Sequence, residues 1–149
     1  MIIIIVIVIE MKEMTEKTKK FSRKREAIRK VLTETDTHPS AEWIYNRLKP
    51  EFPDLSLATV YRNLGEMKKS GEIQSVAFWD GKERFDGVAK KHSHFVCEEC
   101  GKIEDFDFIH QDMSIDDKAR ANFDGTIDFH TLVFYGLCEE CSENVGKKC

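Results

Sequence analysis

Nine consecutive residues, His92 to Cys100, combine two alternating histidines with a pair of cysteines in the sequence HSHFVCEEC. A second CEEC segment begins at Cys138, and residues 101–137 separate the two pairs. Two thiolates that are two residues apart can bind one ion from a tight turn, and two such pairs supply the four soft ligands of a closed tetrahedral zinc site. The separation is longer than in a short zinc ribbon. We therefore predict that a structural zinc ion clamps an intervening strand and helix, with ligands Cys97, Cys100, Cys138 and Cys141.

Four cysteines also have less specific interpretations, as a disulfide pair or as small buried apolar residues. A single CxxC can be a redox motif, but such motifs rarely occur twice, and no thioredoxin-like pattern surrounds these pairs. Structural zinc is therefore the favoured interpretation. Cys149, the fifth cysteine, has no predicted role.

A second group of potential ligands consists of histidines and aspartates. His92 and His94 alternate along a predicted strand, so both imidazoles project from the same face. Asp86 at the end of the upstream hairpin, Asp105 on the paired strand and His38 in an earlier loop could complete the group. These ligands are harder than cysteine and suit ferrous iron, manganese or zinc.

Each of these residues also has an ordinary structural interpretation. His38 precedes a proline and could be a capping or surface residue, and Asp86 precedes a glycine and could belong to a turn. His130, in the last predicted strand, could bind an additional ion but is better explained as a strand residue with a satisfied hydrogen bond. We interpret His110 as a surface residue.

The net charge of −4 conceals two halves of opposite sign. Residues 11–91 contain 18 basic residues against 13 acidic ones, whereas residues 92–149 contain 5 against 13. The basic half could approach a polyanion, and the acidic half would attract cations. A chain of 149 residues accommodates one ordinary domain or two small ones, and the charge distribution favours two.

The first ten residues, MIIIIVIVIE, stand apart from the rest. The apolar run is too short to span a bilayer, which needs about 20 residues, and no basic segment or cleavage site marks a signal peptide. It could form an added strand or promote aggregation, or translation could begin at Met11 or Met14. We treat residues 1–14 as an uncertain extension and expect a cytoplasmic protein without membrane contact.

Residues 15–87 have the pattern of a winged helix-turn-helix domain. Apolar residues at helical spacing predict three short helices, with Ser40 and Ser56 as N-caps of the second and third. A β-hairpin follows, because strand-like segments flank the dipeptide Asp80-Gly81, which suits a type I′ turn. In such a domain the last helix enters the major groove of DNA and the hairpin lies along the backbone.

The third predicted helix carries candidate DNA-binding residues. Its apolar positions leave Thr59, Arg62 and Asn63 on the opposite face. Arg62 could contact a guanine edge and Asn63 an adenine, while Thr59 and Tyr61 could make apolar or phosphate contacts. The same face could instead be the solvated surface of a structural helix. The basic surplus of this half favours DNA.

After a linker at residues 88–91, residues 92–149 are expected to form a small α/β domain. Two short strands meet at a turn containing Gly101, residues 111–122 have a ragged helical pattern, and residues 126–136 alternate as a long strand. A short terminal helix carries the last CxxC. The predicted fold class is α+β, a winged helix-turn-helix domain followed by an α/β domain with a four-cysteine zinc site.

Five segments resemble the Fur superfamily of bacterial metal-dependent regulators: HPSAEWIY, SLATVYRNL, RFDG, HSHFVCEECGKIEDF and FYGLCEEC. The resemblance extends from about residue 22 onward. It implies a homodimer that binds an operator in double-stranded DNA, a C-terminal dimerisation domain, a structural zinc ion and a regulatory metal between the domains. Carried over by position, zinc would be bound by the four cysteines, and regulatory Fe(2+) or Mn(2+) by His38, Asp86, His92, His94 and Asp105.

Two carboxylates indicate the branch of this family. Iron-uptake members usually have glutamate where this chain has Asp86 and Asp105, whereas the peroxide-sensing PerR branch has aspartate at both positions. The chain departs from the family at residues 22–25, where SRKR replaces the usual TPQR. Only Arg25 is kept, so it is the remaining candidate DNA contact of that segment.

The resemblance implies that the regulatory metal fixes the hinge between domains and so sets the spacing of two recognition helices on an operator. In the PerR branch, peroxide reacts with ferrous iron and a ligand histidine, His38 or His92, is oxidised, which releases the operator. No enzyme activity and no organic cofactor are expected. The alternatives are an iron-uptake or zinc-uptake regulator, a non-haem iron enzyme with a facial triad, and a zinc-ribbon interaction module.

Overall fold

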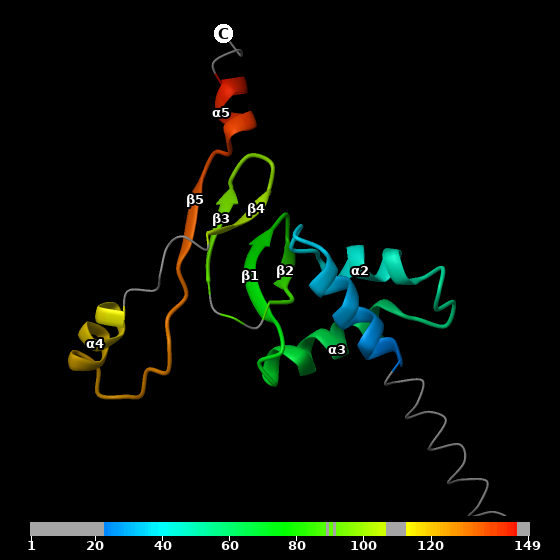
Figure 1. The fold of residues 1–149 in the computed structure, drawn as a ribbon, viewed down its shortest axis with the longest axis horizontal. Coiled ribbons are helices and arrows are strands. Elements are labelled where there is room, and N and C mark those ends of the chain that lie inside the picture. Colours follow the sequence, from blue (N-terminus) through cyan, green and yellow to red (C-terminus); the bar gives the residue numbers. More distant parts are fainter. Residues whose placement is uncertain (1–22, 89, 91, 107–112, 146–149) are drawn as a thin grey trace, which may run out of the picture.

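The computed structural model describes residues 23–88, 90, 92–106 and 113–145. Along these residues, three helices come first, a two-stranded hairpin follows, and a three-stranded sheet with two short helices completes the chain (Figure 1). The predicted N-terminal extension, His110 and Cys149 lie outside these residues. No helix in the described part is both long and apolar enough to cross a membrane.

The three predicted helices of the first half are confirmed. The first covers residues 23–34, α2 spans Ala41–Leu48, and α3 spans Leu57–Lys69. Ser40 and Ser56 cap α2 and α3, since each side-chain oxygen accepts a backbone N–H of the first turn. The apolar faces meet in one core, made of Ile28, Leu32, Ala41, Ile44, Leu48, Leu55, Val60, Leu64, Met67, Ile73 and Phe85.

The predicted hairpin is also confirmed. Strand β1 (Gln74–Trp79) pairs antiparallel with β2 (Lys82–Asp86). The turn residues Asp80 and Gly81 have φ values of 49° and 71°, the two positive values that a type I′ turn requires. In Figure 1 the hairpin lies between the helices and the second sheet.

The second sheet has the strand order β4-β3-β5. Strand β3 (Ser93–Cys97) pairs antiparallel with β4 (Ile103–Phe106) and parallel with β5 (Val133–Gly136). Helix α4 (Met113–Ala121) lies in the connection to β5, and α5 (Glu139–Val145) follows the sheet. The register sets His94 opposite Asp105 and Cys97 opposite Gly136, so both groups of potential ligands depend on β3.

A small apolar cluster joins the hairpin to this sheet. Ala77 of β1 packs with Val96 of β3 and Ile103 of β4, and all three side chains are buried. Burial of such side chains contributes about 1 to 3 kcal/mol each. The contact holds the hairpin, and with it Asp86 at the end of β2, against the sheet that carries the histidines.

The prediction of one long strand over residues 126–136 is wrong. Only Val133–Gly136 is a strand, because it pairs with the four residues from His94 to Cys97 in β3. A strand needs a partner for its backbone groups, and β3 offers none further upstream. The alternating residues before β5 instead form the connection to α4, which lies away from the sheet (Figure 1).

Gly87 occupies a position where a side chain does not fit. A Cβ atom there would lie 2.7 Å from the backbone carbonyl carbon and oxygen of Leu32, in the helix of residues 23–34. We expect Gly87→Ala to lower the free energy of unfolding by about 1 to 3 kcal/mol, measured by denaturant titration. Gly65→Ala is the matched control, because a Cβ atom at Gly65 in α3 meets nothing within 4 Å. Equal stability of the two variants would contradict this close approach.

Candidate metal centres

The four paired cysteines lie together at one end of the second sheet. Cys97 ends β3, Cys100 lies in the following turn, Cys138 precedes α5, and Cys141 lies in its first turn. Their Sγ atoms all lie within 4.8 Å of one another. The four are free thiols, with 3.8 Å between the sulfur atoms of Cys100 and Cys138. These four cysteines therefore do not form the disulfide pair that was considered as an alternative. Their compact arrangement matches the soft donor set of a structural zinc site.

Local backbone structure brings the two cysteine pairs together. The N–H of Gly101 donates to the carbonyl of Cys97, and Gly101 has a φ of 71°, which closes the first pair into a tight turn. The N–H of Glu98 donates to the carbonyl of Gly136 and joins that turn to the end of β5. The parallel pairing of β3 with β5 thus carries the second pair to the first.

Backbone donors prepare one of these thiols for a cation. The N–H of Cys138 donates to Sγ of Cys97 at 3.4 Å. This hydrogen bond, together with one from the backbone of Cys100, lowers the pKa of Cys97 to about 6. Hydrogen bonding with the side chain of Cys138 raises the pKa of Cys141 instead. A site that already favours one thiolate suits a divalent ion, which binds cysteine sulfur in its deprotonated form.

The histidines and aspartates form a second cluster between the hairpin and the second sheet. Potential ligand atoms of His38, Asp86, His92 and His94 all lie within 4.8 Å of one another. Asp105 joins them, since its Oδ1 lies 2.9 Å from Nε2 of His38 and 3.2 Å from Nε2 of His92. The structure therefore brings together all five residues that were predicted to surround one ion; their role as ligands stays a prediction.

The ligand atoms of this cluster point at a shared space instead of at one another. Nε2 of His92, Nε2 of His94 and Oδ2 of Asp86 are buried and have no hydrogen-bond partner among the described residues. Oδ2 of Asp86 nevertheless lies only 3.3 Å and 3.5 Å from these two nitrogens. A buried polar atom without a partner costs about 1 to 3 kcal/mol. Three such atoms in one place fit a divalent cation that binds them all.

The remaining polar atoms of these residues fix their orientation. Nδ1 of His92 lies 2.8 Å from the carbonyl of Lys90, which it reaches as a donor and so leaves Nε2 with a free lone pair. The N–H of Val88 donates to Oδ1 of Asp86 at 2.7 Å, which leaves Oδ2 available. These are the outer contacts through which proteins orient metal ligands.

Burial and neighbouring charges change the pKa values in this cluster. Burial lowers the pKa of His38, although Asp105 and Asp86 oppose the shift, so this imidazole is kept neutral. Burial also acts to lower the pKa of His92, but the Lys90 carbonyl and the two aspartates outweigh it and the pKa is raised. For Asp86, burial acts to raise the pKa, but the neighbouring imidazole of His94 and the hydrogen bond from the N–H of Val88 outweigh it and the pKa is lowered. Aspartate oxygens beside imidazole nitrogens form a donor set that favours a bound cation.

The candidate DNA-binding residues of α3 have different surroundings. Tyr61 is exposed, and its hydroxyl donates to Glu42 of α2 at 2.7 Å. Arg62 is exposed, whereas Thr59 is partly buried and its hydroxyl bonds with that of Ser56. The guanidinium of Arg25 lies 3.1 Å and 2.6 Å from the carboxylates of Glu66 and Glu72. Arg25, which was predicted as a DNA contact, therefore makes two ion pairs within the chain.

The prediction that Asn63 lies on the outer face of α3 is wrong. Asn63 is fully buried, and its Nδ2 donates to the carbonyl of Thr59 at 2.8 Å. The physical reason is helical spacing, since Asn63 follows Val60 by three residues and precedes Met67 by four, both of which are core residues. A single polar residue inside an apolar stripe is therefore no sign of an outer face.

His130 lies in the connection before β5 and not within a strand. Its Nδ1 is 2.7 Å from Oδ1 of Asp116, a carboxylate of α4 that is 3% exposed. Sequence reasoning expected a satisfied hydrogen bond at His130, and the structure confirms this bond for Nδ1. The partner Asp116 was missed, because neither its spacing nor its neighbours in the sequence distinguish it from exposed acidic residues.

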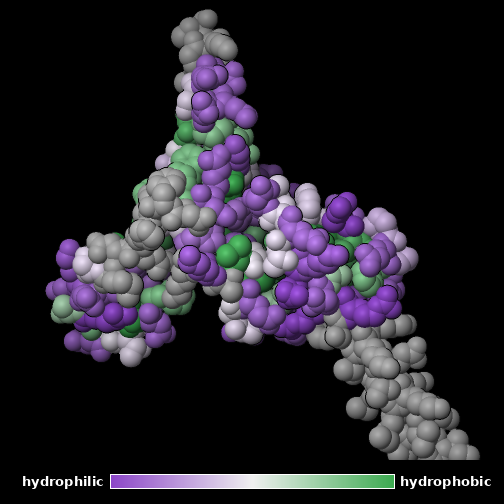
Figure 2. Space-filling view, viewed as in Figure 1, coloured by the Kyte–Doolittle hydropathy of each residue, from purple (hydrophilic) through white to green (hydrophobic). Residues whose placement is uncertain are grey.

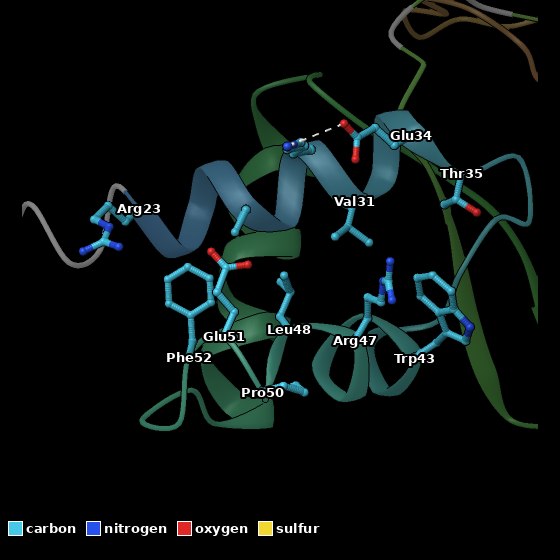
Figure 3. Close-up of a pocket in the computed structure, with 12 residues that line it drawn as sticks. Arg23, Val31, Glu34, Thr35, Trp43, Arg47, Leu48, Pro50, Glu51 and Phe52 are labelled. Atoms are coloured by element: carbon cyan, nitrogen blue, oxygen red, sulfur yellow. Dashed lines mark ion pairs between the residues drawn. The ribbon is translucent and has the colours of Figure 1, made fainter.

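One cavity lies away from both clusters. A groove of about 820 Å³ separates the helix of residues 23–34 from α2 (Figure 3). Apolar side chains such as Val31 and Leu48 share its walls with charged ones, and Glu34 pairs with Lys30 at 3.8 Å. Among its described lining residues there is no histidine or cysteine, so the groove has neither donor set.

Comparisons with known proteins agree with this geometry. The model of the ferric uptake regulator family matches residues 16–135. The chain is 39% identical over 119 residues to the peroxide-responsive repressor PerR of Staphylococcus saprophyticus, which covers 80% of each chain. A peroxide stress regulator from Campylobacter jejuni has a TM-score of 0.73 at 26% identity, over 88% of this chain and 98% of that chain. The Helicobacter pylori ferric uptake regulator Fur shares the fold, with a TM-score of 0.66 at 24% identity over 89% and 91% of the two chains.

The four-cysteine cluster predicts how zinc content responds to substitution. We expect Cys100→Ser to lower zinc from one ion per chain to well below one and to lower the melting temperature, because a closed site contributes its binding free energy to folding. Elemental analysis and thermal denaturation measure the two effects. Cys149→Ser is the control and should change neither quantity. One retained zinc ion per Cys100→Ser chain would contradict the assignment.

Proposed function

The chain belongs to the ferric uptake regulator family, and from that premise we propose that it is a metal-dependent repressor of transcription of the peroxide-responsive PerR type. One observation supports this proposal above the others. Five potential ligands from both halves of the chain converge, and the two carboxylates among them are Asp86 and Asp105. A curated relative with 39% identity is a peroxide-responsive repressor.

We assign separate roles to the two clusters. The cysteines would hold structural zinc and keep the end of the second sheet closed, because soft thiolates saturate a tetrahedral site. The histidines and aspartates would hold Fe(2+) or Mn(2+), which prefer nitrogen and oxygen ligands. The regulatory metal belongs to this second cluster because only there do ligands come from both halves of the chain.

The regulatory ligands would act on the hinge between residues 15–87, proposed as the DNA-binding domain, and residues 92–149, proposed as the dimerisation domain. His38 and Asp86 belong to the first part, and His92, His94 and Asp105 to the second, with the linker at residues 88–91 between them. When all five share one ion, the two parts take a single relative orientation. The ion stabilises that orientation only by its higher affinity for the closed form.

The DNA-reading surface is proposed on the exposed part of α3. Tyr61 and Arg62 are exposed there, and hydrogen bonds tie the helix to its neighbours through Tyr61 to Glu42 and through Lys68 to Glu83. These ties give α3 a fixed orientation, which recognition in the major groove requires. Thr59 could contribute a phosphate contact from the N-terminal turn. Asn63 is not proposed as a base contact, since it is buried.

A homodimer would pair the reading helices of two chains on one operator. The second part of the chain exposes large apolar side chains that suit a second copy: Phe123, Phe129, Tyr135 and Leu137. Figure 2 shows hydrophobic atoms gathered over the stalk of the molecule below α5, where the second sheet lies. Tyr135 and Leu137 belong to the second sheet and its end, so this surface is proposed as the dimer interface, whereas Phe123 and Phe129 lie in the segment around α4.

Peroxide sensing is proposed to occur at the histidines. When bound, ferrous iron would supply the electrons that cleave the O–O bond of peroxide, whereas manganese would hold the same ligands without this reaction. His38 and His92 present Nε2 to the shared space, so either ring would lie beside the bound iron and within reach of oxidation. An imidazole that gains an oxygen atom would bind the ion less well, and the hinge would open.

An iron-uptake or zinc-uptake regulator is the second candidate function, because the fold is shared with a ferric uptake regulator. The two assignments differ in the residue expected at positions 86 and 105. Iron-uptake regulators usually have glutamate there, which is one methylene group longer than the aspartate of this chain. The non-haem enzyme is disfavoured, since a facial triad uses three ligands and leaves positions open for substrate, whereas five groups converge in this cluster. Proteins of this family are regulators, and we propose the same here.

The peroxide response can be tested on operator binding. We expect dilute hydrogen peroxide to release operator DNA from the iron-loaded dimer and to leave the manganese-loaded dimer bound, because only ferrous iron reduces peroxide under these conditions. Gel-shift assays measure release, and peptide mass spectrometry should find one added oxygen at His38 or His92 in the iron form alone. Release from neither form would favour the uptake-regulator assignment.

A further inference from the structure

We propose that Arg84 is a positioning residue that holds the His38 loop in the conformation needed to bind the regulatory metal. The inference rests on the proposed function, because it assumes that His38 is a ligand. Arg84 lies on β2, two residues before Asp86, and it is not a ligand itself. Within the described part of the chain no ion pair joins it to a carboxylate, so its donors are available to backbone carbonyls.

The donors of Arg84 are directed at backbone carbonyls of the His38 loop. Nη2 donates to the carbonyl of Thr37 at 2.7 Å, and Nε donates to the carbonyl of His38. The N–H of Phe85, the next residue of β2, donates to the carbonyl of Pro39 at 3.1 Å. Three consecutive carbonyls of the loop are thus held by two consecutive residues of the strand that ends in Asp86. The ligand loop is fastened to the ligand strand.

The loop needs this fastening because its backbone is strained. His38 has a φ of 49°, in the left-handed region that residues with a side chain rarely adopt, and it precedes a proline, which restricts it further. Such a conformation persists when surrounding contacts hold it in place. Without the bonds from Arg84, the carbonyl of His38 would be free to turn, and Nε2 would leave the space that it shares with His92 and His94.

The same guanidinium reaches the zinc-binding end of the sheet. Nη1 of Arg84 lies 3.4 Å from the carbonyl of Gly101, the residue after Cys100. A cavity of about 680 Å³ lies between the His38 loop and the turn at Gly101. Its lining residues include Thr37, Arg84, Cys100 and Asp105. This space lies beside Thr37, whereas His38 and Ser40 are buried, so the bonds of Arg84 act on the less packed side of the loop. The planar fork of arginine can address three carbonyls at once, and a lysine ammonium at one point cannot.

The proposal is tested by measuring manganese affinity. Mn(2+) is titrated into zinc-loaded protein, and the free ion is followed by electron paramagnetic resonance. We expect Arg84→Lys to raise the dissociation constant about 10- to 100-fold, the usual effect of removing an outer contact of a metal ligand, while zinc stays at one per chain and operator affinity at saturating Mn(2+) is unchanged. Arg120→Lys is the matched control, because Arg120 also donates to a carbonyl, that of Ile127, but lies outside the site.

A double-mutant cycle with His38→Ala shows whether Arg84 acts through His38. We expect Arg84→Lys to have no further effect on manganese affinity in the His38→Ala background. An equal loss in both backgrounds, or no loss in either, would overturn the inference and leave the proposed function standing. If His38→Ala alone leaves manganese affinity unchanged, both fail. Should Arg84→Lys not fold, Arg84→Gln is carried through the same cycle and decides by the same criteria.

Discussion

The structure depends on one constraint. Buried ligand atoms from both halves of the chain lie so close together that a single cation has to compensate them all. Nε2 of His92, Nε2 of His94 and Oδ2 of Asp86 are buried without hydrogen-bond partners among the described residues. Burying polar atoms without a hydrogen bond or a bound ion costs free energy. The helices, the hairpin and the second sheet meet in a way that places these atoms together. Their meeting point is therefore where a cation has the largest effect on the arrangement of the whole chain.

The two clusters differ in ligand chemistry and in position, and both differences bear on what a bound ion would do. All four cysteines belong to the second half of the chain and lie at one end of one sheet, so an ion bound there stabilises a unit without changing how it meets the hairpin. The histidines and aspartates lie at the junction of the hairpin and the sheet. Soft thiolates suit zinc, and imidazole with carboxylate suits iron or manganese. The proposed division into a structural ion and a regulatory ion therefore rests on donor type and location together.

Much of the site could be predicted from the sequence, because local spacing determines it. CxxC pairs, alternating histidines, serine caps and the Asp-Gly turn all act within a few residues, and the structure confirms the elements that carry them. Where side-chain surroundings depend on tertiary contacts, sequence reasoning failed. Asn63 was placed on the wrong face, and the predicted strand is shortened to Val133–Gly136, the residues that pair with β3. No role was predicted for Arg84, because its partners are backbone carbonyls of the His38 loop, 46 residues earlier in the sequence.

The empty closed arrangement must be less stable than the loaded one for the site to act as a switch. Asp86 and Asp105 both lie within 3.5 Å of His94, so two carboxylates face one small space whenever no cation is present. Under the proposed function, the repulsion between these carboxylates and the unpartnered nitrogens would raise the free energy of the closed form when the ion is absent. An open form would relieve both costs by letting water reach the same groups. The groups proposed to bind the ion would then also favour separation of the two halves once the ion is lost.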